Sequence, residues 1–202
     1  MSVRGYNNDV LFSKANSEGL TTKTNSAPST IDDDTENVTG GICSGITSSW
    51  MIALLNANKM QEARDTAKFP ELYNNSLRFQ GAYFKELHGT AEKHLPAAGV
   101  VAVVNGEPLV KIEKRNIATN DIPTLGWWAC YVSMRGHAIG IGKYNKFFHI
   151  MDPNFGLFTY RDQMDFVADV NGLIDSYFGY KGYPITKKSI FHFYKRSSGA
   201  KG

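Results

Sequence analysis

A hairpin pattern in the second half of the chain constrains the fold most. Residues 137–144 (HAIGIGKY) show the alternating pattern of a strand, in which His137 lies on the same face as Ile139 and Ile141. A turn at 144–146 leads into residues 147–152 (FFHIMD), which predict the returning strand. Pairing through this turn joins residues whose numbers sum to about 290, so we expect Asp152 beside His137 at the open end. A slip of one residue decides whether the two share a face, and the sequence leaves that open.

A cysteine among glycines precedes a second patterned segment. Residues 40–45 read Gly-Gly-Ile-Cys-Ser-Gly, and apolar residues then recur every four positions from Ile46 to Leu54, which predicts a helix over residues 44–58. Free N–H groups and the positive end of the helix dipole stabilise a thiolate at such a position. Glycines beside Cys43 leave its sulfur uncovered, as a nucleophile requires. The alternative is a buried cysteine that only packs.

A catalytic cysteine needs a base and a third group that orients the base. His137, with Asp152 nearby, fits these two roles. The second cysteine, Cys130, lies in an apolar run that predicts a buried strand, so we expect it in the core. The other four histidines fit the role of the base less well. His88, His94 and His192 fit positions at the surface or structural positions with satisfied hydrogen bonds, and the rival base His149 lies in the middle of a strand.

Three motifs together resemble one known family. They are Gly41-Ile42-Cys43 before a Trp-bearing helix, Gly136-His137-Ala138-Ile139, and residues 151–158 (MDPNFGLF). The chain resembles the YopT-type cysteine peptidases, papain-like enzymes found among secreted bacterial effectors, over roughly residues 37–195. The resemblance implies that Cys43 is the nucleophile, His137 the general base and Asp152 the orienting acid.

The resemblance also implies an oxyanion hole. Papain-like enzymes place a side-chain amide about half a dozen residues before the nucleophile, where this chain has Asn37. Its amide and the backbone N–H of Cys43 would stabilise the charge on a tetrahedral intermediate. Asn37 could equally belong to a polar loop. Asn154 is a rival donor, although a turn role explains it as well.

The expected fold is α+β and papain-like, with a helical lobe that carries the cysteine packed against an antiparallel sheet that carries the histidine and aspartate. We expect a flexible polar leader over 1–36, a catalytic domain over 37–195 and a flexible tail over 196–202. The predicted helices are 44–58, 60–67, 72–87 and 164–178, with a buried segment at 100–104, and the predicted strands are 126–134, 137–144, 146–152, 156–160 and 190–194.

Composition limits the function classes. The 202 residues are 42% hydrophobic, enough for one core, and two cysteines in such different settings predict neither a disulfide framework nor a metal site. A net charge of +3 without an arginine-rich stripe argues against nucleic-acid binding, and Lys111, Lys114 and Arg115 predict a solvated turn or strand end. The sequence shows no signal-peptide core and no long apolar run.

The expected function is therefore that of a cysteine endopeptidase, a secreted bacterial effector or toxin that leaves the bacterium without a classical signal peptide and works in the reducing cytosol of a target cell. We expect a monomer without a cofactor, acting on a protein or peptide substrate that could be membrane-associated. Two alternatives stay open: a cell-wall peptide amidase or acyltransferase with the same triad, and a non-catalytic interaction module.

Overall fold

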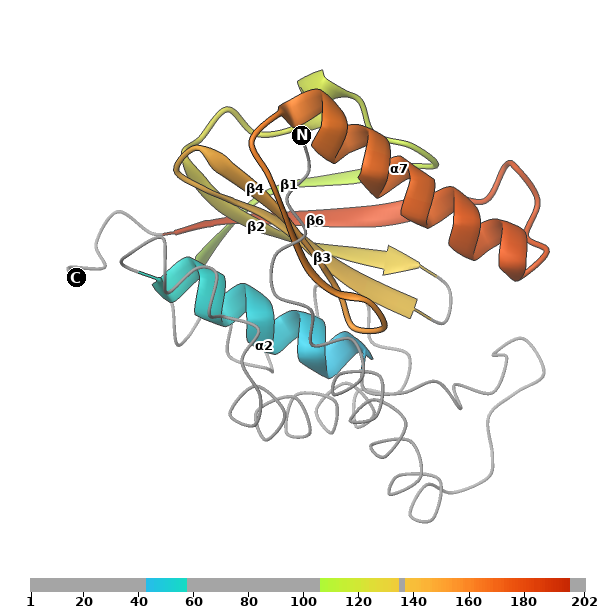
Figure 1. Ribbon diagram of the computed structural model, residues 1–202, viewed down its shortest axis with the longest axis horizontal. Helices are drawn as coiled ribbons and strands as arrows, with labels where there is room; N and C mark the ends of the chain where they lie inside the picture. Colours follow the sequence, from blue (N-terminus) through green and yellow to red (C-terminus); the bar gives the residue numbers. More distant parts are fainter. Residues whose placement is uncertain (1–42, 58–105, 135–136, 197–202) are drawn as a thin grey trace, which may run out of the picture.

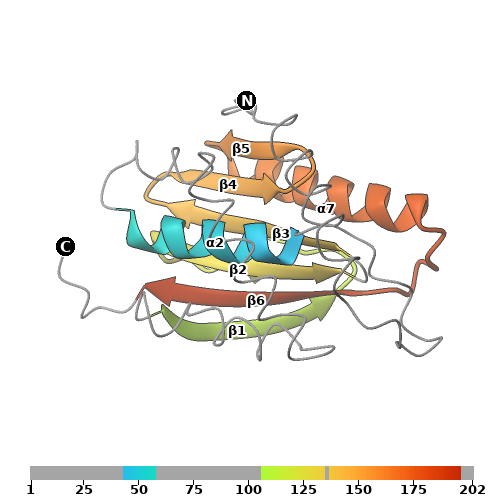
Figure 2. The ribbon, with the colours of Figure 1, turned by 90° about the horizontal axis from the view of Figure 1, so that it is seen from below.

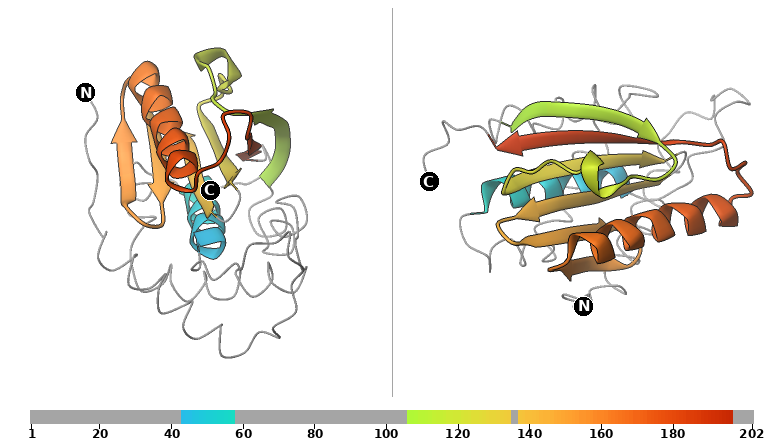
Figure 3. Two further views of the ribbon diagram at one scale, coloured as in Figure 1. Left: turned by 90° about the vertical axis from the view of Figure 1, so that its right-hand side faces the viewer. Right: turned by 90° about the horizontal axis from the view of Figure 1, so that it is seen from above.

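The computed structural model describes residues 43–57, 106–134 and 137–196, which form a sheet between two helices (Figures 1 and 2). The sheet is antiparallel, with the strand order β1-β6-β2-β3-β4-β5. Helix α2 covers one face and helix α7 the other (Figure 3). The elements are α2 (Cys43–Asn56), β1 (Gly106–Lys114), the 3-10 turn η1 (Thr119–Asp121), β2 (Trp127–Met134), β3 (His137–Tyr144), β4 (Phe147–Asp152), β5 (Gly156–Tyr160), α7 (Gln163–Tyr180) and β6 (Ser189–Arg196).

The predicted elements within these residues are confirmed to within two residues at each end, and the bounds of β3 and β5 match as predicted. Strand β1 was not predicted. The interpretation of Lys111 as part of a turn is wrong, because it lies within β1, whereas Lys114 does end that strand. The alternation of apolar and polar residues in β1 is weak. This strand pairs with β6 alone among the described strands, most of its side chains are exposed, and it contains Pro108. The predicted helices 60–67 and 72–87 and the segment 100–104 lie outside the described residues.

Helix α2 lies close to β3 because that strand presents small residues to it. The indole of Trp50 is fully buried against Gly140, where a Cβ atom would lie 2.5 Å from Cε3 of the indole. Two residues further along the strand, a Cβ on Gly142 would clash with Leu54. The alternation of isoleucine and small residues in β3 therefore serves both layers: the isoleucines face α7, and the small residues make room for α2.

Helix α7 packs its apolar stripe against the opposite face of the sheet. The carboxylate of Asp162 caps the helix by accepting from the N–H groups of Met164 and Asp165. The buried residues of the helix join the core around Trp128: Phe166, Val167, Val170, Ile174 and Phe178. Adjacent Trp127 points to the other layer, where it packs half-buried beside α2, because successive side chains of a strand face opposite ways.

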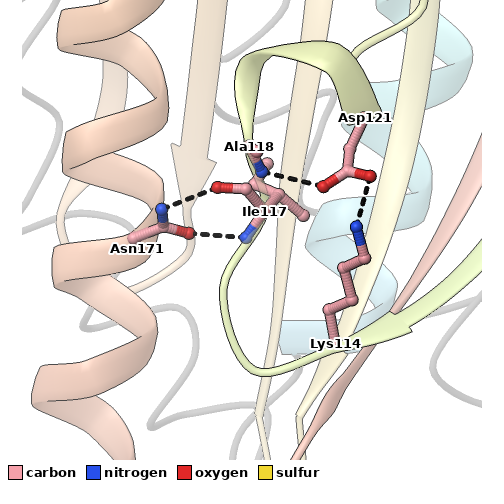
Figure 4. A network of polar contacts seen from close by, with 5 residues as sticks. All are labelled: Lys114, Ile117, Ala118, Asp121 and Asn171. Atoms are coloured by element: carbon pink, nitrogen blue, oxygen red, sulfur yellow. Dashed lines mark hydrogen bonds and ion pairs between the residues drawn. The ribbon is translucent and has the colours of Figure 1, made fainter.

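A polar network ties the connection after β1 to α7 (Figure 4). The side chain of Asn171 accepts from Ile117 N at 2.9 Å and donates to Ile117 O at 2.9 Å. The carboxylate of Asp121 accepts from Ala118 N and pairs with Lys114. These bonds satisfy backbone N–H and C=O groups of the residues that follow the end of β1. No helix in the described part of the chain is both long and apolar enough to span a membrane.

Candidate active site

The register of the hairpin puts His137 and Asp152 on one face. Strands β3 and β4 pair Ile141 with Ile150 and Gly140 with Met151. One further step places Asp152 opposite Ile139, which shares its face with His137 because side chains alternate along a strand. The expected proximity is confirmed, since Nε2 of His137 lies 3.4 Å from Oδ1 of Asp152.

Both side chains of this pair are almost removed from water. The side chain of His137 is 7% exposed and that of Asp152 is 5% exposed. Oδ1 of Asp152 also accepts a hydrogen bond from Asn154 N at 2.8 Å, and the backbone carbonyl of Asp152 accepts one from Phe155 N at 3.1 Å. The backbone of Asn154 thus belongs to a turn that fixes the carboxylate, which supports the turn interpretation of this residue.

Cys43 is the first residue of α2, a partly buried free thiol that interacts with the same imidazole. Burial by itself lowers the pKa of His137, but hydrogen bonds to Asp152 and Cys43, together with their charges, raise this pKa from 6.5 to about 10. The imidazole therefore holds a proton at neutral pH. Because Nε2 faces Asp152, Nδ1 is the nitrogen available to the sulfur.

Two hydrogen bonds hold the first turn of α2 against the sheet beside His137. The hydroxyl of Thr47 donates to the carbonyl of Ala138 at 3.2 Å, one residue after the histidine. The phenol of Tyr131 on β2 donates to the hydroxyl of Ser44 at 2.8 Å, one residue after the cysteine. Both bonds are buried, so they fix the position of the helix start relative to β3.

The other end of α2 is fixed by carbonyl contacts. Trp127 Nε1 donates to Leu54 O at 3.0 Å, and a guanidinium nitrogen of Arg196 lies 3.5 Å from Ala57 O. The guanidinium also lies 4.2 Å from the centroid of the Trp127 ring. A positive charge at the C-terminal end of a helix is favourable. The helix that carries Cys43 is thus held at both ends.

Sequence reasoning missed Tyr177, which contacts the imidazole from α7. The two ring centroids lie 5.2 Å apart, with an angle of 31° between the ring planes. No local signal marks this residue, because its contact with His137 depends on how α7 packs against the sheet. Periodicity gave only its place on the predicted helix 164–178.

The other predicted residues fall as follows. Cys130 is fully buried in the core, as expected, and burial raises the pKa of its thiol despite a weaker opposing hydrogen bond with the backbone of His192. His149 is buried in mid-strand with Nδ1 3.1 Å from Thr159 Oγ1, away from the cysteine helix start. His192 is buried on β6.

Asn37, His88 and His94 lie outside the described residues, so the oxyanion role of Asn37 stays a prediction.

The described residues contain no group of three or more His, Cys, Asp or Glu side chains that could hold a metal ion. The chemistry that this arrangement can support is proton transfer between a thiol and an imidazole whose second nitrogen faces a carboxylate. Such a constellation can generate a nucleophilic thiolate and later protonate a leaving group.

Comparisons with known proteins identify solved structures with a similar fold. No family model matches the sequence, and no curated protein matches it either. The solved structure of the Pseudomonas avirulence protein AvrPphB is similar, with 17% sequence identity and a TM-score of 0.52 over 85% of this chain and 97% of that one. The structure of PatoxP, a cysteine protease-like domain of the Photorhabdus asymbiotica toxin PaTox, is 15% identical with a TM-score of 0.43. That match covers 95% of this chain but only 61% of the other, less than two thirds of its length.

At 17% identity the likeness to AvrPphB establishes the fold and nothing finer. It confirms the expected α+β, papain-like arrangement in which a helix carries Cys43 at its start and an antiparallel sheet carries His137 and Asp152. At the level of the fold, the chain is thus similar to the YopT-type cysteine proteases that its motifs resemble.

Proposed function

We propose that the chain is a cysteine endopeptidase in which Cys43 is the nucleophile, His137 the general base and acid, and Asp152 the orienting group. The observation that carries the proposal is the geometry of the three side chains: Nε2 of His137 lies 3.4 Å from Oδ1 of Asp152, and Cys43, the first residue of α2, interacts with the same imidazole. Both contacts raise the pKa of His137 although burial opposes this. Burial alone would favour a neutral histidine, so the protonated form depends on these two partners.

The proposed cycle begins with the proton already on the imidazole. The thiolate of Cys43 attacks the carbonyl carbon of the scissile peptide, and the electron pair of the C=O bond moves to its oxygen. The N–H of Cys43 and, as predicted, the amide of Asn37 stabilise this oxyanion. His137 then gives its proton to the leaving amine, the C–N bond breaks, and a thioester remains.

The second half of the cycle restores the thiolate. The neutral His137 takes a proton from water, and the resulting hydroxide attacks the thioester carbonyl. The carbon–sulfur bond breaks, the carboxylic acid leaves, and the imidazolium faces the thiolate again. The side chain of Asp152 holds the imidazole in the tautomer and orientation that both proton transfers need. Because His137 and Asp152 are almost excluded from water, the electrostatic interaction between them is stronger than it would be in water.

The proposed setting is that of a bacterial effector or toxin that cleaves a target-cell protein. The fold likeness to an avirulence protein supports this role, and a free thiol at the helix start suits a reducing cytosol. We propose a catalytic domain over residues 37–195 that works as a monomer and is secreted by a bacterium.

A peptide library tests the proposal. The wild-type protein is incubated with peptides from a eukaryotic proteome, and mass spectrometry identifies new termini. We expect cleavage by the wild type and by the control Cys130→Ala, and none by Cys43→Ala or His137→Ala with unchanged circular dichroism. Cleavage by Cys43→Ala at the wild-type rate would overturn the proposal. Cleavage of cell-wall peptides alone would support the amidase alternative instead.

A further inference from the structure

The connection between α7 and β6 exposes apolar and basic side chains together. Within residues 180–188, Tyr180 is 85% exposed and Ile185 is 84% exposed, the two highest values among the exposed large hydrophobic residues of the described chain. The same nine residues contain three lysines and no acidic residue: Lys181, Lys187 and Lys188. We call residues 180–188 the docking segment.

The exposure of these side chains is built into a defined backbone. Lys181 N donates to Tyr177 O at 3.1 Å and Tyr183 N donates to Phe178 O at 2.9 Å, while Gly182 takes a positive φ of 66° that closes the helix end. The ring of Tyr183 packs against Phe178 with centroids 5.7 Å apart, which anchors the segment in the core.

Beyond this anchor, a second turn presents Ile185. Lys187 N donates to Pro184 O at 2.9 Å, so Ile185 lies within a closed turn. The apolar side chain therefore stands in water although the turn around it is hydrogen-bonded. An exposed apolar side chain held in this way costs free energy in solution and gains it when an apolar medium covers it.

The lysines of the docking segment differ from the cations beside them. Arg115 pairs with Asp175 at 2.7 Å, and Lys114 pairs with Asp121. None of the three lysines of the segment forms an ion pair with a carboxylate of the described residues. Lys181 and Lys187 instead lie over the rings of Tyr180 and Tyr183, each 5.9 Å from the centroid. The segment therefore carries uncompensated positive charge beside its apolar side chains.

We propose that the docking segment binds the surface of an anionic lipid membrane. The lysines would contact the lipid headgroups, and Tyr180 and Ile185 would enter the boundary between headgroups and acyl chains, which is where aromatic and apolar side chains of peripheral proteins lie. A lipid surface fits better than an acidic protein, because a stable protein interface buries about 800 Å² on each partner and needs a broad complementary face. The segment offers two projecting side chains on short turns.

The position of the segment gives the membrane a role in the proposed reaction. Tyr177, whose ring packs against His137, lies one helical turn before Tyr180, and Lys181 N donates to the carbonyl of Tyr177. Figure 1 shows the C-terminal end of α7 and the Cys43 end of α2 at the same end of the sheet, towards the right of the view, although the two helices cover opposite faces. Docking would hold the candidate site near the lipid surface and favour substrates attached there. This last step rests on the proposed peptidase function, whereas the binding itself does not.

Vesicle co-sedimentation tests the binding directly. The full chain is mixed with phosphatidylcholine vesicles or with vesicles that also contain phosphatidylserine. We expect binding to the anionic vesicles only, weaker by about 100-fold after Lys181, Lys187 and Lys188 are all changed to Gln. The double change Tyr180→Ser with Ile185→Ser should weaken it by about tenfold.

Two controls remove three lysines and one exposed apolar side chain from other parts of the chain. Changing Lys143, Lys146 and Lys195 to Gln removes the same charge, and Met164→Ser removes a side chain that is 72% exposed at the other end of α7. Both controls should bind like the wild type, and so should Cys43→Ala, which separates docking from peptidase activity. A wild-type protein that stays in the supernatant, equal losses in the controls, or binding to polyglutamate but not to vesicles would overturn the proposal.

Discussion

The ring of Tyr177 packs against the imidazole of His137 in a tilted arrangement, with 5.2 Å between the centroids. This contact joins α7, on one face of the sheet, to the strand end that meets the start of α2. It adds a ring contact to the hydrogen bonds that His137 makes with Cys43 and Asp152. Tyr177 is therefore expected to act as a positioning residue for the proposed reaction.

Substitution of Tyr177 separates positioning from simple packing. Tyr177→Phe keeps an aromatic ring against the imidazole and should retain activity, whereas Tyr177→Leu frees the imidazole and should lower kcat about tenfold with little change in KM. The NMR resonances of the His137 ring should move in the leucine variant alone. Met164→Ala, on an exposed part of the same helix, is the control. Wild-type kcat and ring resonances in Tyr177→Leu would contradict the positioning role.

Asp152→Asn should change the pH profile as well as the rate. The hydrogen bond and charge of Asp152 help to raise the pKa of His137, so their loss should move the alkaline limb of the kcat/KM profile from near pH 10 to lower pH. The rate should fall on the order of 10²- to 10⁴-fold. Asp169→Asn, which alters a carboxylate bonded to Tyr160 Oη, should leave the limb in place. An unshifted limb in Asp152→Asn would argue against the assignment.

The stability of the fold should depend on pH through His137. Its pKa is raised in the folded state, so the stabilisation by the protonated ring is complete below its unfolded-state pKa of about 6.5 and is lost as the pH rises towards about 10. Urea unfolding at a series of pH values measures this. The difference in unfolding free energy between the wild type and His137→Gln should shrink between pH 6.5 and 10. A difference that stays constant over this range would refute the raised pKa.

The contact of Trp50 with Gly140 predicts an asymmetric pair of glycine variants. Gly140→Ala puts a methyl group 2.5 Å from the indole, so the helix that carries Cys43 must shift, at a cost of about 1–3 kcal/mol. Gly172→Ala is the matched control, because it lies inside α7 with nothing within 4 Å and should stabilise the helix by about 0.5–1 kcal/mol. Thermal unfolding of both variants decides this. Equal effects would mean that α2 does not depend on the small residues of β3.

The sequence predicted much of this arrangement because the hairpin is local. Alternation over residues 137–144 and the turn that follows fixed the place of His137 and Asp152 to within one residue of register. It could not fix the parity, because that depends on the backbone of the turn, where Asn145 has a positive φ of 57°. One residue decides whether the carboxylate faces the imidazole or the opposite layer.

What the sequence could not give depends on packing between distant segments. The contacts of Thr47 with Ala138, and of Tyr131 with Ser44, join residues about ninety positions apart, at separations of 91 and 87. Tyr177 meets His137 only because α7 crosses the sheet in a particular place. Strand β1 escaped prediction for a different reason, since most of its side chains are exposed and its hydrophobic pattern is weak.

The activation of Cys43 by His137 is the central claim, and alkylation measures it most directly. The native protein is treated with iodoacetamide near neutral pH, and mass spectrometry follows Cys43 and Cys130 separately in the wild type and in His137→Ala. We expect rapid alkylation of Cys43, none of the buried Cys130, and a large loss of Cys43 reactivity without the histidine. A Cys43 that is as inert as Cys130, or that reacts equally fast in His137→Ala, would contradict the account.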